Sequence, residues 1–315
     1  EIPEIIKEFF MSSVKYDDDK LAAYHTAYFN SGAVLYIPDN VEITEPIEGI
    51  FYQDSDSDVP FNKHILIVAG KNSKISYLER LESRGEGSAK ATANITVEVI
   101  ARSGAQVKFA AIDRLGENVT AYISRRGKLG NDASIDWAIA VMNEGNVIAD
   151  FDSDLLGNGS HADLKAIALS SGRQIQGIDT RVTNYGCNSI GNILQHGVIL
   201  EKATLTFNGI GHIIKGAKGA DAQQESRVLM LSDQARSDAN PILLIDENDV
   251  TAGHAASIGQ VDPEDMYYLM SRGLDKATAE RLVVRGFLGS VIVEIPVKEV
   301  RDEMIATIEE KLSKR

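Results

Sequence analysis

The middle of the chain, from residue 63 to residue 245, alternates apolar or small side chains with polar ones in short runs. Between Val147 and Asp154, the odd positions are apolar or small, and three of the four even positions are aspartate. This period of two is typical of a β-strand whose two faces meet different surroundings. Frequent glycines between the runs would interrupt any long helix. The pattern therefore predicts many short strands separated by turns.

The same alternation recurs at a steady interval. Units that begin at Ala105, Ala133 and Ala162 each hold two short strands around a glycine turn, and their starts lie 28 and 29 residues apart. A steady pitch of paired strands is typical of a solenoid, in which each rung pairs with its neighbours. A β-sandwich also contains many short strands, but its strands need not recur as similar pairs. The repeat favours the solenoid and leaves the sandwich as the alternative.

The two ends of the chain differ from the middle. Residues 1–62 mix helical spacing with strand-like runs, and we expect them to form a separate N-terminal segment. Residues 246–315 predict a helical subdomain, because Asp262 precedes a proline, Asp275 opens a second helix, and an apolar stripe follows from Val300 to Leu312. We expect these helices to cover an end of the solenoid that would otherwise expose a sheet edge, and to dock a partner.

Composition narrows the classes of function. The chain has 315 residues, a formal net charge of −14 and a single cysteine, Cys187. An acidic chain lacks the clustered lysine and arginine that bind nucleic-acid backbones, and no apolar run approaches the roughly 20 residues of a membrane helix. A lone cysteine excludes an internal disulfide and suits a reducing cytoplasm. We therefore expect a cytoplasmic protein that binds neither nucleic acid nor membrane. Because the first methionine is Met11, we also expect the native N-terminus to be missing.

The familiar catalytic motifs fail in this sequence. Gly209-Ile210-Gly211 is not followed by a glycine at dinucleotide-binding spacing, and neither a G-x-S-x-G elbow nor an H-E-x-x-H pair occurs. A β-helix enzyme that cleaves polysaccharides would be expected to carry paired carboxylates and aromatic platforms. Trp137 is the one tryptophan, and no convincing acid pair is present. We therefore expect a non-catalytic protein, with a polysaccharide-active β-helix as a distant alternative.

The segment from residue 239 to residue 262 is more specific than any of these motifs. It reads ANPILLIDENDVTAGHAASIGQVD and is followed by YYLMSRG at residues 267–273. Both stretches, together with QQESRVL at residues 223–229, resemble the SufB/SufD family of the SufBCD machine for iron–sulfur cluster assembly. A match in order over so many positions is much harder to obtain by chance than a short motif.

This resemblance implies a right-handed parallel β-helix with a C-terminal helical domain, in agreement with the repeat. It implies pairing with SufB through the β-helix and docking of the ATPase SufC on the C-terminal helices. ATP would then be used by SufC, no cofactor would be bound tightly, and iron or an iron–sulfur cluster would be held transiently and shared with SufB. The isolated chain is expected to be able to form a homodimer. The near absence of cysteine favours the SufD type over a SufB-like homodimeric scaffold that holds a cluster itself, which is the alternative.

Two sets of residues are candidates for these roles. Clusters are held mainly by cysteine and occasionally by histidine, so a chain with one cysteine supplies at most a minority of the ligands. His254 matches the family's histidine implicated in cluster assembly, and it is our candidate metal ligand; the alternative is a hydrogen-bonded interface or core histidine. Cys187 lies outside the matching motif and is expected to be incidental. The candidates for docking SufC are large apolar residues of the C-terminal helices: Tyr267, Tyr268, Met270 and Phe287.

Overall fold

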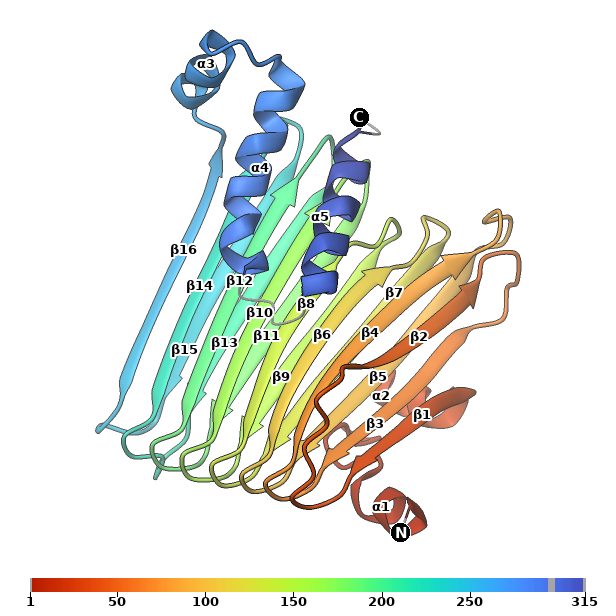
Figure 1. The fold of residues 1–315 in the computed structure, drawn as a ribbon, viewed down its shortest axis with the longest axis vertical. Coiled ribbons are helices and arrows are strands. Elements are labelled where there is room, and N and C mark those ends of the chain that lie inside the picture. The colour runs from red at the N-terminus through yellow and green to blue at the C-terminus, as the bar shows by residue number, and fades with distance from the viewer. Residues whose placement is uncertain (1, 294–297, 314–315) are drawn as a thin grey trace.

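The computed structural model describes residues 2–293 and 298–313, which form a parallel β-solenoid of about eight turns with helices near both ends of the chain (Figure 1). Successive strands alternate between two eight-stranded sheets, so each turn contributes one strand to each sheet. The odd-strand sheet consists of β1 Ser31–Ile37, β3 Phe61–Ala69, β5 Ala91–Ala101, β7 Val119–Leu129, β9 Val147–Leu155, β11 Ile175–Asn184, β13 Thr204–Ile213 and β15 Arg236–Ile245. The even-strand sheet consists of β2 Ile47–Asp54, β4 Lys74–Arg84, β6 Gln106–Arg114, β8 Ser134–Val141, β10 His161–Ser170, β12 Ile190–Ile199, β14 Asp221–Met230 and β16 Thr251–Gln260. The predicted solenoid is confirmed, and the β-sandwich is excluded because neighbouring strands within each sheet are parallel.

The strands extend beyond the range in which the alternation is clear. They run from Ser31 to Gln260, so β1 and β2 lie in the N-terminal segment 1–62 and β16 lies within 246–315. The side chains of β1 and β16 are mostly exposed and show little alternation in burial. The sequence pattern therefore underestimates the length of the solenoid at both ends.

The register differs from the sequence repeat in one unit. Ala162 pairs with Ile135, two positions beyond Ala133, while Phe109, Trp137 and Leu164 form one continuous row across β6, β8 and β10. A shift of two residues leaves every side chain on the same face, so the alternation alone cannot detect it.

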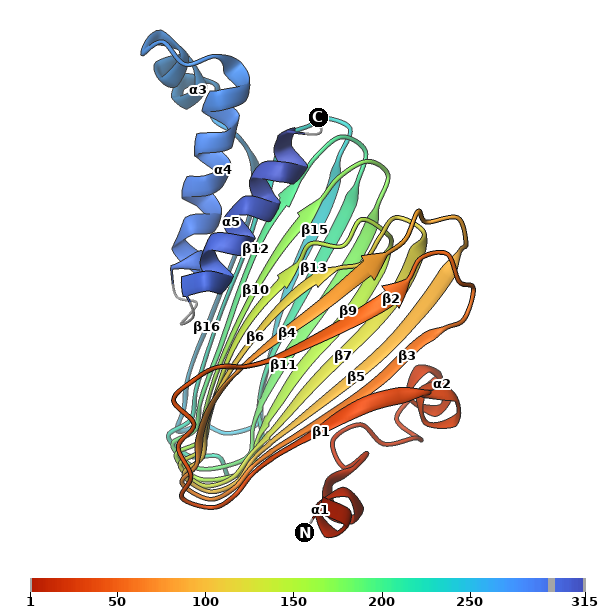
Figure 2. The same ribbon diagram turned by 45° about the vertical axis from the view of Figure 1, so that its right-hand side comes forward.

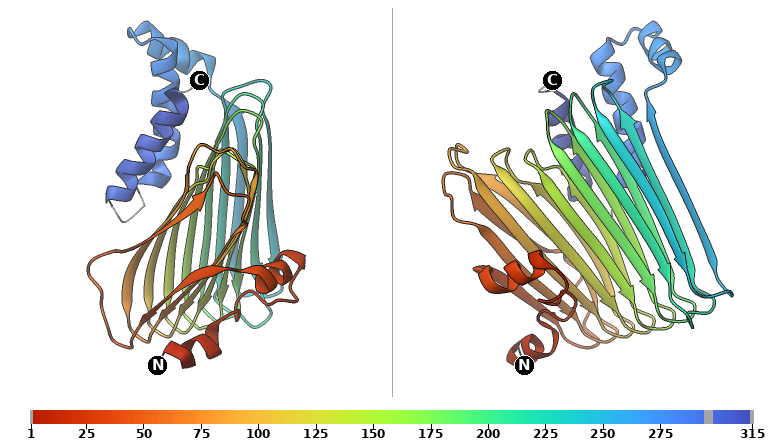
Figure 3. Two further views of the ribbon diagram at one scale, coloured as in Figure 1. Left: turned by 90° about the vertical axis from the view of Figure 1, so that its right-hand side faces the viewer. Right: turned by 180° about the vertical axis from the view of Figure 1, so that it is seen from behind.

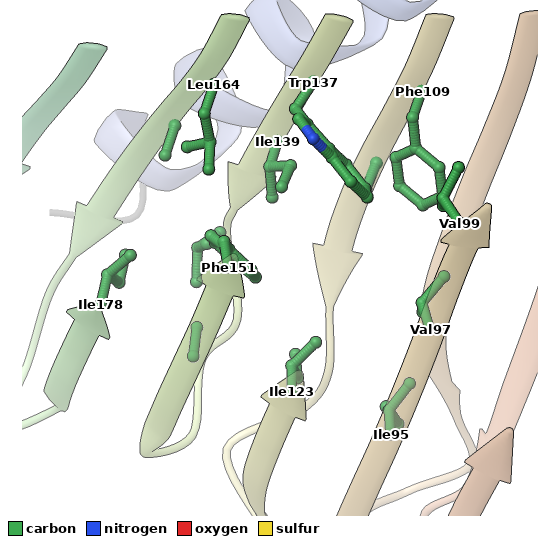
Figure 4. Packing of buried hydrophobic residues seen from close by; sticks show 14 of the residues in the cluster. Ile95, Val97, Val99, Phe109, Ile123, Trp137, Ile139, Phe151, Leu164 and Ile178 are labelled. Atoms are coloured by element: carbon green, nitrogen blue, oxygen red, sulfur yellow. The ribbon is translucent and has the colours of Figure 1, made fainter. Parts of the chain in front are cut away.

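Apolar side chains from both sheets fill the interior between them (Figure 4). Tyr77, Phe109 and Trp137 lie in a row along the even-strand sheet with tilted rings, whose centroids are 5.4 and 4.8 Å apart. The indole nitrogen of Trp137 donates a hydrogen bond to the Ser153 hydroxyl at 3.0 Å. Because Trp137 is 2% exposed, this bond satisfies a donor that would be costly to bury alone.

The interior also contains an ion triad. Arg125 donates to Glu79 through Nε at 3.2 Å and Nη2 at 2.6 Å, and to Asp113 through Nη1 at 2.9 Å and Nη2 at 2.7 Å. All three side chains are fully buried. Burial raises the pKa of Glu79, and the neighbouring guanidinium opposes that shift. The triad links β4 and β6 to β7 of the opposite sheet.

The C-terminal helices are α3 Pro263–Ser271, α4 Lys276–Ile292 and α5 Lys298–Ser313. The predicted caps are confirmed: Asp262 accepts a hydrogen bond from the backbone of Glu264, and Asp275 accepts one from Thr278, each at 2.8 Å. Helices α4 and α5 lie along the outer face of the even-strand sheet (Figures 1 and 2). Within the described part of the chain, no helix is both long enough and apolar enough to cross a membrane.

Our expectation that these helices cover an end of the solenoid is wrong. Val284, Leu288 and Met304 instead pack on apolar residues that the middle strands present outward, such as Ile112 and Ile167. The outer face of a parallel sheet that carries such residues needs a cover, and the helices provide it there. The edges of β15 and β16 therefore stay uncovered by residues 2–293 and 298–313.

Two short helices, α1 Ile2–Phe9 and α2 Lys20–Tyr28, lie against the odd-strand sheet, on the side opposite α4 and α5 (Figure 3). Ile5 of α1 packs on Leu66, Val68 and Ile100, which β3 and β5 present outward. The N-terminal segment thus covers the outer face of the first rungs.

Candidate functional site

The C-terminal end of the solenoid is formed by β15 and β16. Within the described sheets, β15 pairs with β13 and β16 pairs with β14, and the other edge of each strand has no strand beside it. Apolar side chains remain exposed on these strands, including Ile242 at 40% and Ile258 at 41%. An open pair of edges with exposed apolar residues is a surface suited to pairing with another chain.

His254 lies on β16 at this open end. It pairs in register with Gln224, which pairs with Ile193, which in turn pairs with Leu164. In a parallel sheet these partners share one face, and Leu164 and Ile193 are buried in the interior. His254 therefore lies in the row that faces the solenoid interior, yet it is exposed because β16 is the last strand of its sheet.

The interior behind His254 contains polar side chains. The side-chain nitrogen of Gln224 donates to the Ile242 carbonyl at 2.9 Å, while its Oε1 is buried with no hydrogen-bond partner among the described residues. Two residues further along β14, Ser226 donates to Gln195 of β12 at 2.7 Å. The mouth of the solenoid thus presents a histidine above buried amide and hydroxyl groups, an arrangement that can bind a polar or metal-containing ligand.

The imidazole of His254 can offer one nitrogen to such a ligand. Nowhere in residues 2–293 and 298–313 do three His, Cys, Asp or Glu side chains gather in a way that would hold a metal ion. Cys187 lies in the turn between β11 and β12, where its thiol contacts the Gly216 carbonyl at 3.4 Å. A metal centre at His254 would therefore take its other ligands from another molecule.

Beside His254, a depression of about 530 Å³ crosses β10, β12, β14 and β16. Asp163, which lines this depression, accepts hydrogen bonds from His161 at 2.9 Å and from Asn192 at 2.7 Å. The bond to His161 lowers the pKa of Asp163 and, from the other side, raises the pKa of His161. Burial and the nearby Asp163 charge raise the pKa of Asp136 on the adjacent strand. The sequence analysis missed this cluster, because Asp163 and Asn192 are 29 residues apart and meet through the register of β10 and β12.

The candidate docking residues fall into two groups. Tyr267, Tyr268 and Met270 lie on α3 and are 76%, 56% and 45% exposed. The guanidinium of Arg272 lies 5.0 Å from the ring centre of Tyr268. Phe287 lies on α4 and packs toward the sheet, with its ring 5.0 Å from that of His196 and its carbonyl 3.3 Å from His196 Nδ1. Three of the four residues thus form an exposed surface on α3, and Phe287 helps to hold α4 on the sheet.

Comparison with known proteins identifies relatives over most of the chain. Residues 51–287 match the family model described as "SUF system FeS cluster assembly, SufBD core domain". The chain is 45% identical, over 311 residues, to the iron–sulfur cluster assembly protein SufD of Bacillus subtilis; this alignment covers 98% of the chain and 71% of that protein.

More distant relatives occur in staphylococci. The chain is 26% identical, over 295 residues, to an iron–sulfur cluster assembly SufBD family protein of Staphylococcus epidermidis, and 24% identical to one from Staphylococcus aureus. The alignments cover 94% of the chain and 63% of each staphylococcal protein, so the chain spans less than two thirds of their length. The family predicted from residues 239–262 is confirmed, and the chain belongs to the SufBD family of the SUF iron–sulfur cluster assembly system.

Proposed function

We propose that this chain is a non-catalytic scaffold subunit for iron–sulfur cluster assembly that pairs with a SufB-type partner through the open end formed by β15 and β16. The observation that carries the proposal is the exposed, interior-facing position of His254 on the last strand of the even-strand sheet. The uncovered edge of β16 can pair with a strand of the partner and so continue the sheet across the interface. The exposed Ile242 and Ile258 add apolar contact area.

The iron–sulfur cluster is cargo in this proposal. The chain offers one cysteine, which lies in a turn, and one histidine at the mouth of the solenoid. Thiolates from the partner would provide most of the cluster ligands, and the His254 nitrogen would complete the set from this side of the interface. A shared site of this kind would form or break as the two subunits move relative to one another.

We assign the docking of a SufC-type ATPase to the exposed surface of α3. Two tyrosines and a methionine there present large side chains to solvent, and aromatic side chains are enriched among residues that dominate binding energy at interfaces. Helix α4 connects α3 to the packed face of the even-strand sheet, so a force applied at α3 would reach the strands that end at the open edge (Figure 1). ATP hydrolysis by the partner would in this way alter the interface that holds the cargo.

The test of the metal-binding role is co-expression with SufB- and SufC-type partners, followed by measurement of iron and sulfide in the purified complex. His254→Ala should leave the complex intact and lower its cluster content severalfold. His212→Ala is the matched control, because His212 lies on the outer face of β13 and pairs with Asp246 at 3.1 Å. A His254→Ala complex that carries as much cluster as the unaltered complex would remove His254 from the site.

The test of the docking role uses charge substitutions on α3. Tyr267→Asp should weaken retention of the ATPase by about tenfold or more, as expected for a residue at the centre of an interface. Tyr16→Asp is the matched control, because Tyr16 is 67% exposed and lies in the N-terminal segment. Equal retention by the two variants would exclude this surface.

The alternative is a homodimeric scaffold in which two copies pair through the same open edges. The feature that favours it is the uncovered edges of β15 and β16, which two identical copies could bring together across a two-fold axis. Reconstitution of the isolated chain with iron and sulfide separates the two functions, since a stable cluster on the isolated chain would support the homodimer.

A further inference from the structure

A row of amide side chains crosses the outer face of the odd-strand sheet and ends at its open edge. The Nδ2 of Asn208 donates to Oδ1 of Asp179, and the Nδ2 of Asn240 donates to Oδ1 of Asn208 at 2.9 Å. These residues belong to β11, β13 and β15 and pair with one another in register. The row therefore runs from the middle of the sheet to the last strand, which has no strand on its other side among the described residues.

The carboxylate at one end of the row sets the direction of every bond in it. An ionised carboxylate can only accept, so Asn208 turns its nitrogen toward Asp179 and its oxygen toward β15. Asn240 then turns its nitrogen toward Asn208, which leaves its Oδ1 directed away from that residue. Burial raises the pKa of Asp179, but the bond from Asn208 opposes this shift and favours the ionised form. Among residues 2–293 and 298–313, none donates to the exposed Oδ1 of Asn240.

The main chain of β15 is interrupted next to Asn240. In a parallel sheet, successive residues of a strand bond alternately to the strands on either side. The backbone N–H groups of Arg236 and Asp246 donate to carbonyls at the two ends of β13, so the even-numbered residues of β15 bond to β13 and the odd-numbered ones face the open edge. Pro241 is odd-numbered and has no N–H to offer. A strand placed beside β15 therefore meets a missing donor at this point.

Strand β16 differs from β15 in both respects. The Thr251 N–H bonds to the β14 side, so the even-numbered residues of β16 face its open edge, and residues 252–260 include no proline. On its outer face, the comparable row through Asp163 and Asn192 ends at Gly253, which has no side chain. Strand β16 can thus pair through an unbroken main chain, whereas β15 offers a side-chain acceptor beside a gap in its main chain.

We propose that Asn240 selects the strand that lies beside β15, and that this strand belongs to the SufB-type partner and carries an asparagine or glutamine opposite Asn240. This inference rests on the proposed pairing through β15 and β16. Neighbouring strands lie about 4.7–4.9 Å apart, the spacing that Asn240 already spans to reach Asn208, so an amide on the next strand extends the row by one bond. A carboxylate there would place oxygen against oxygen, and an aliphatic side chain would leave Asn240 without a donor.

A second copy of this chain fits less well at this point. Where Asn240 meets the same residue of another copy across a two-fold axis, both amides present their oxygens. One of the two amides must then rotate and give up its bond to Asn208. The row thereby favours a different chain that supplies the donor, since specificity is a difference between the affinities for two partners.

The first test measures the affinity of the full chain for the SufB-type protein encoded in the same genome. Asn240→Leu should weaken binding by roughly tenfold, because it leaves the partner's amide without an acceptor. Asn146→Leu is the matched control and should leave the affinity unchanged, because Asn146 is equally exposed but precedes β9 and accepts from the Ile175 backbone. Unchanged affinity of Asn240→Leu would overturn the inference and leave the pairing in place. Failure of the unaltered proteins to form a complex would overturn both.

The second test follows hydrogen exchange of residues 236–245 in the free chain and in the complex. The edge-facing N–H groups of Ala239 and Leu243 should gain protection on binding, whereas the N–H groups that bond to β13 should change little. Protection confined to residues 251–260 would show that the partner pairs with β16 alone, and would remove Asn240 from the interface.

The third test identifies the residue opposite Asn240. A chain with Asn240→Cys and Cys187→Ser is oxidised in the presence of SufB-type variants that each carry one added cysteine along their edge strand. A disulfide requires Cα atoms within about 7 Å, so the position that links is the neighbour of residue 240. The native residue at that position should be asparagine or glutamine, and any other residue would overturn the proposal. Preferential linkage between two copies of this chain would also overturn it, because the second copy would then occupy this edge.

Discussion

The buried triad of Arg125, Glu79 and Asp113 gives a prediction that can be worked out in detail. Replacing Arg125 with Met keeps most of the side-chain volume but removes the guanidinium that donates four hydrogen bonds to the two carboxylates. All three side chains are fully buried, so water cannot replace the lost partner. The variant must either bury uncompensated negative charge or bind protons.

The expected cost at pH 7 is about 3–5 kcal/mol of unfolding free energy, the range found when one partner of a buried ion pair is removed. With an unfolding entropy of about 2.1 cal/mol/K per residue, a chain of 315 residues that unfolds as one unit would lose roughly 5–8 °C in melting temperature. Replacing all three residues, as Glu79→Leu, Asp113→Leu and Arg125→Met, should restore much of this loss, because an apolar set of similar volume needs no counter-charges.

The assay is thermal unfolding followed by circular dichroism between pH 5 and pH 7. Without the opposing guanidinium, burial should raise the pKa of Glu79 in the folded chain further above its unfolded value near 4, so the folded state binds more protons. Its deficit in stability should then shrink as the pH falls from 7 to 5. An Arg125→Met variant that melts within 1 °C of the unaltered chain would refute the reasoning, and so would a deficit that does not vary with pH.

Three further predictions concern other parts of the structure. Trp137→Ala should lower the free energy of unfolding, measured by chemical denaturation, by about 3–5 kcal/mol, because it removes a buried ring and leaves a cavity in the solenoid. A loss below about 1 kcal/mol would show that the surrounding side chains close the cavity. Met304→Ala should lower the free energy of unfolding by about 2–5 kcal/mol, because Met304 packs α5 on the sheet. It should also speed hydrogen exchange in α5 more than in β8, and equal acceleration in both elements would show that α5 does not detach separately from the sheet. Asp163→Asn should return the pKa of His161 from its raised value toward about 6.5 in an NMR titration, whereas an unchanged pKa would exclude Asp163 as its cause.

The local pattern of the sequence determined the class of the fold. Alternation with a period of two predicted the strands, the steady interval predicted stacked rungs, and the caps Asp262 and Asp275 placed the starts of α3 and α4. These features depend on residues close together in the chain, so they can be read without knowledge of the distant contacts. The family resemblance of residues 239–262 also depends on sequence alone, and it pointed to His254 before the strand that carries it was known.

Register and packing were decided in three dimensions. The period of two cannot distinguish a rung from one shifted by two residues, which is why Ala162 was aligned with Ala133 although it pairs with Ile135. The sequence placed the start of a helix at Asp275 but did not show which surface that helix covers, so Phe287 was assigned to an exposed site although it packs toward the sheet.

Buried charge was the least predictable feature. Glu79 and Arg125 are 46 residues apart, and each stands in the apolar row of its own strand, where the alternation does not show which distant partner it meets. Likewise, His25 and Glu98 belong to different elements and meet only across the face of the odd-strand sheet, through His64. The sequence by itself determined that the chain forms paired strands and ends in helices. The tertiary structure decided which polar groups are buried together, because a charge or a proton is stable in the interior only when a partner from a distant strand meets it there.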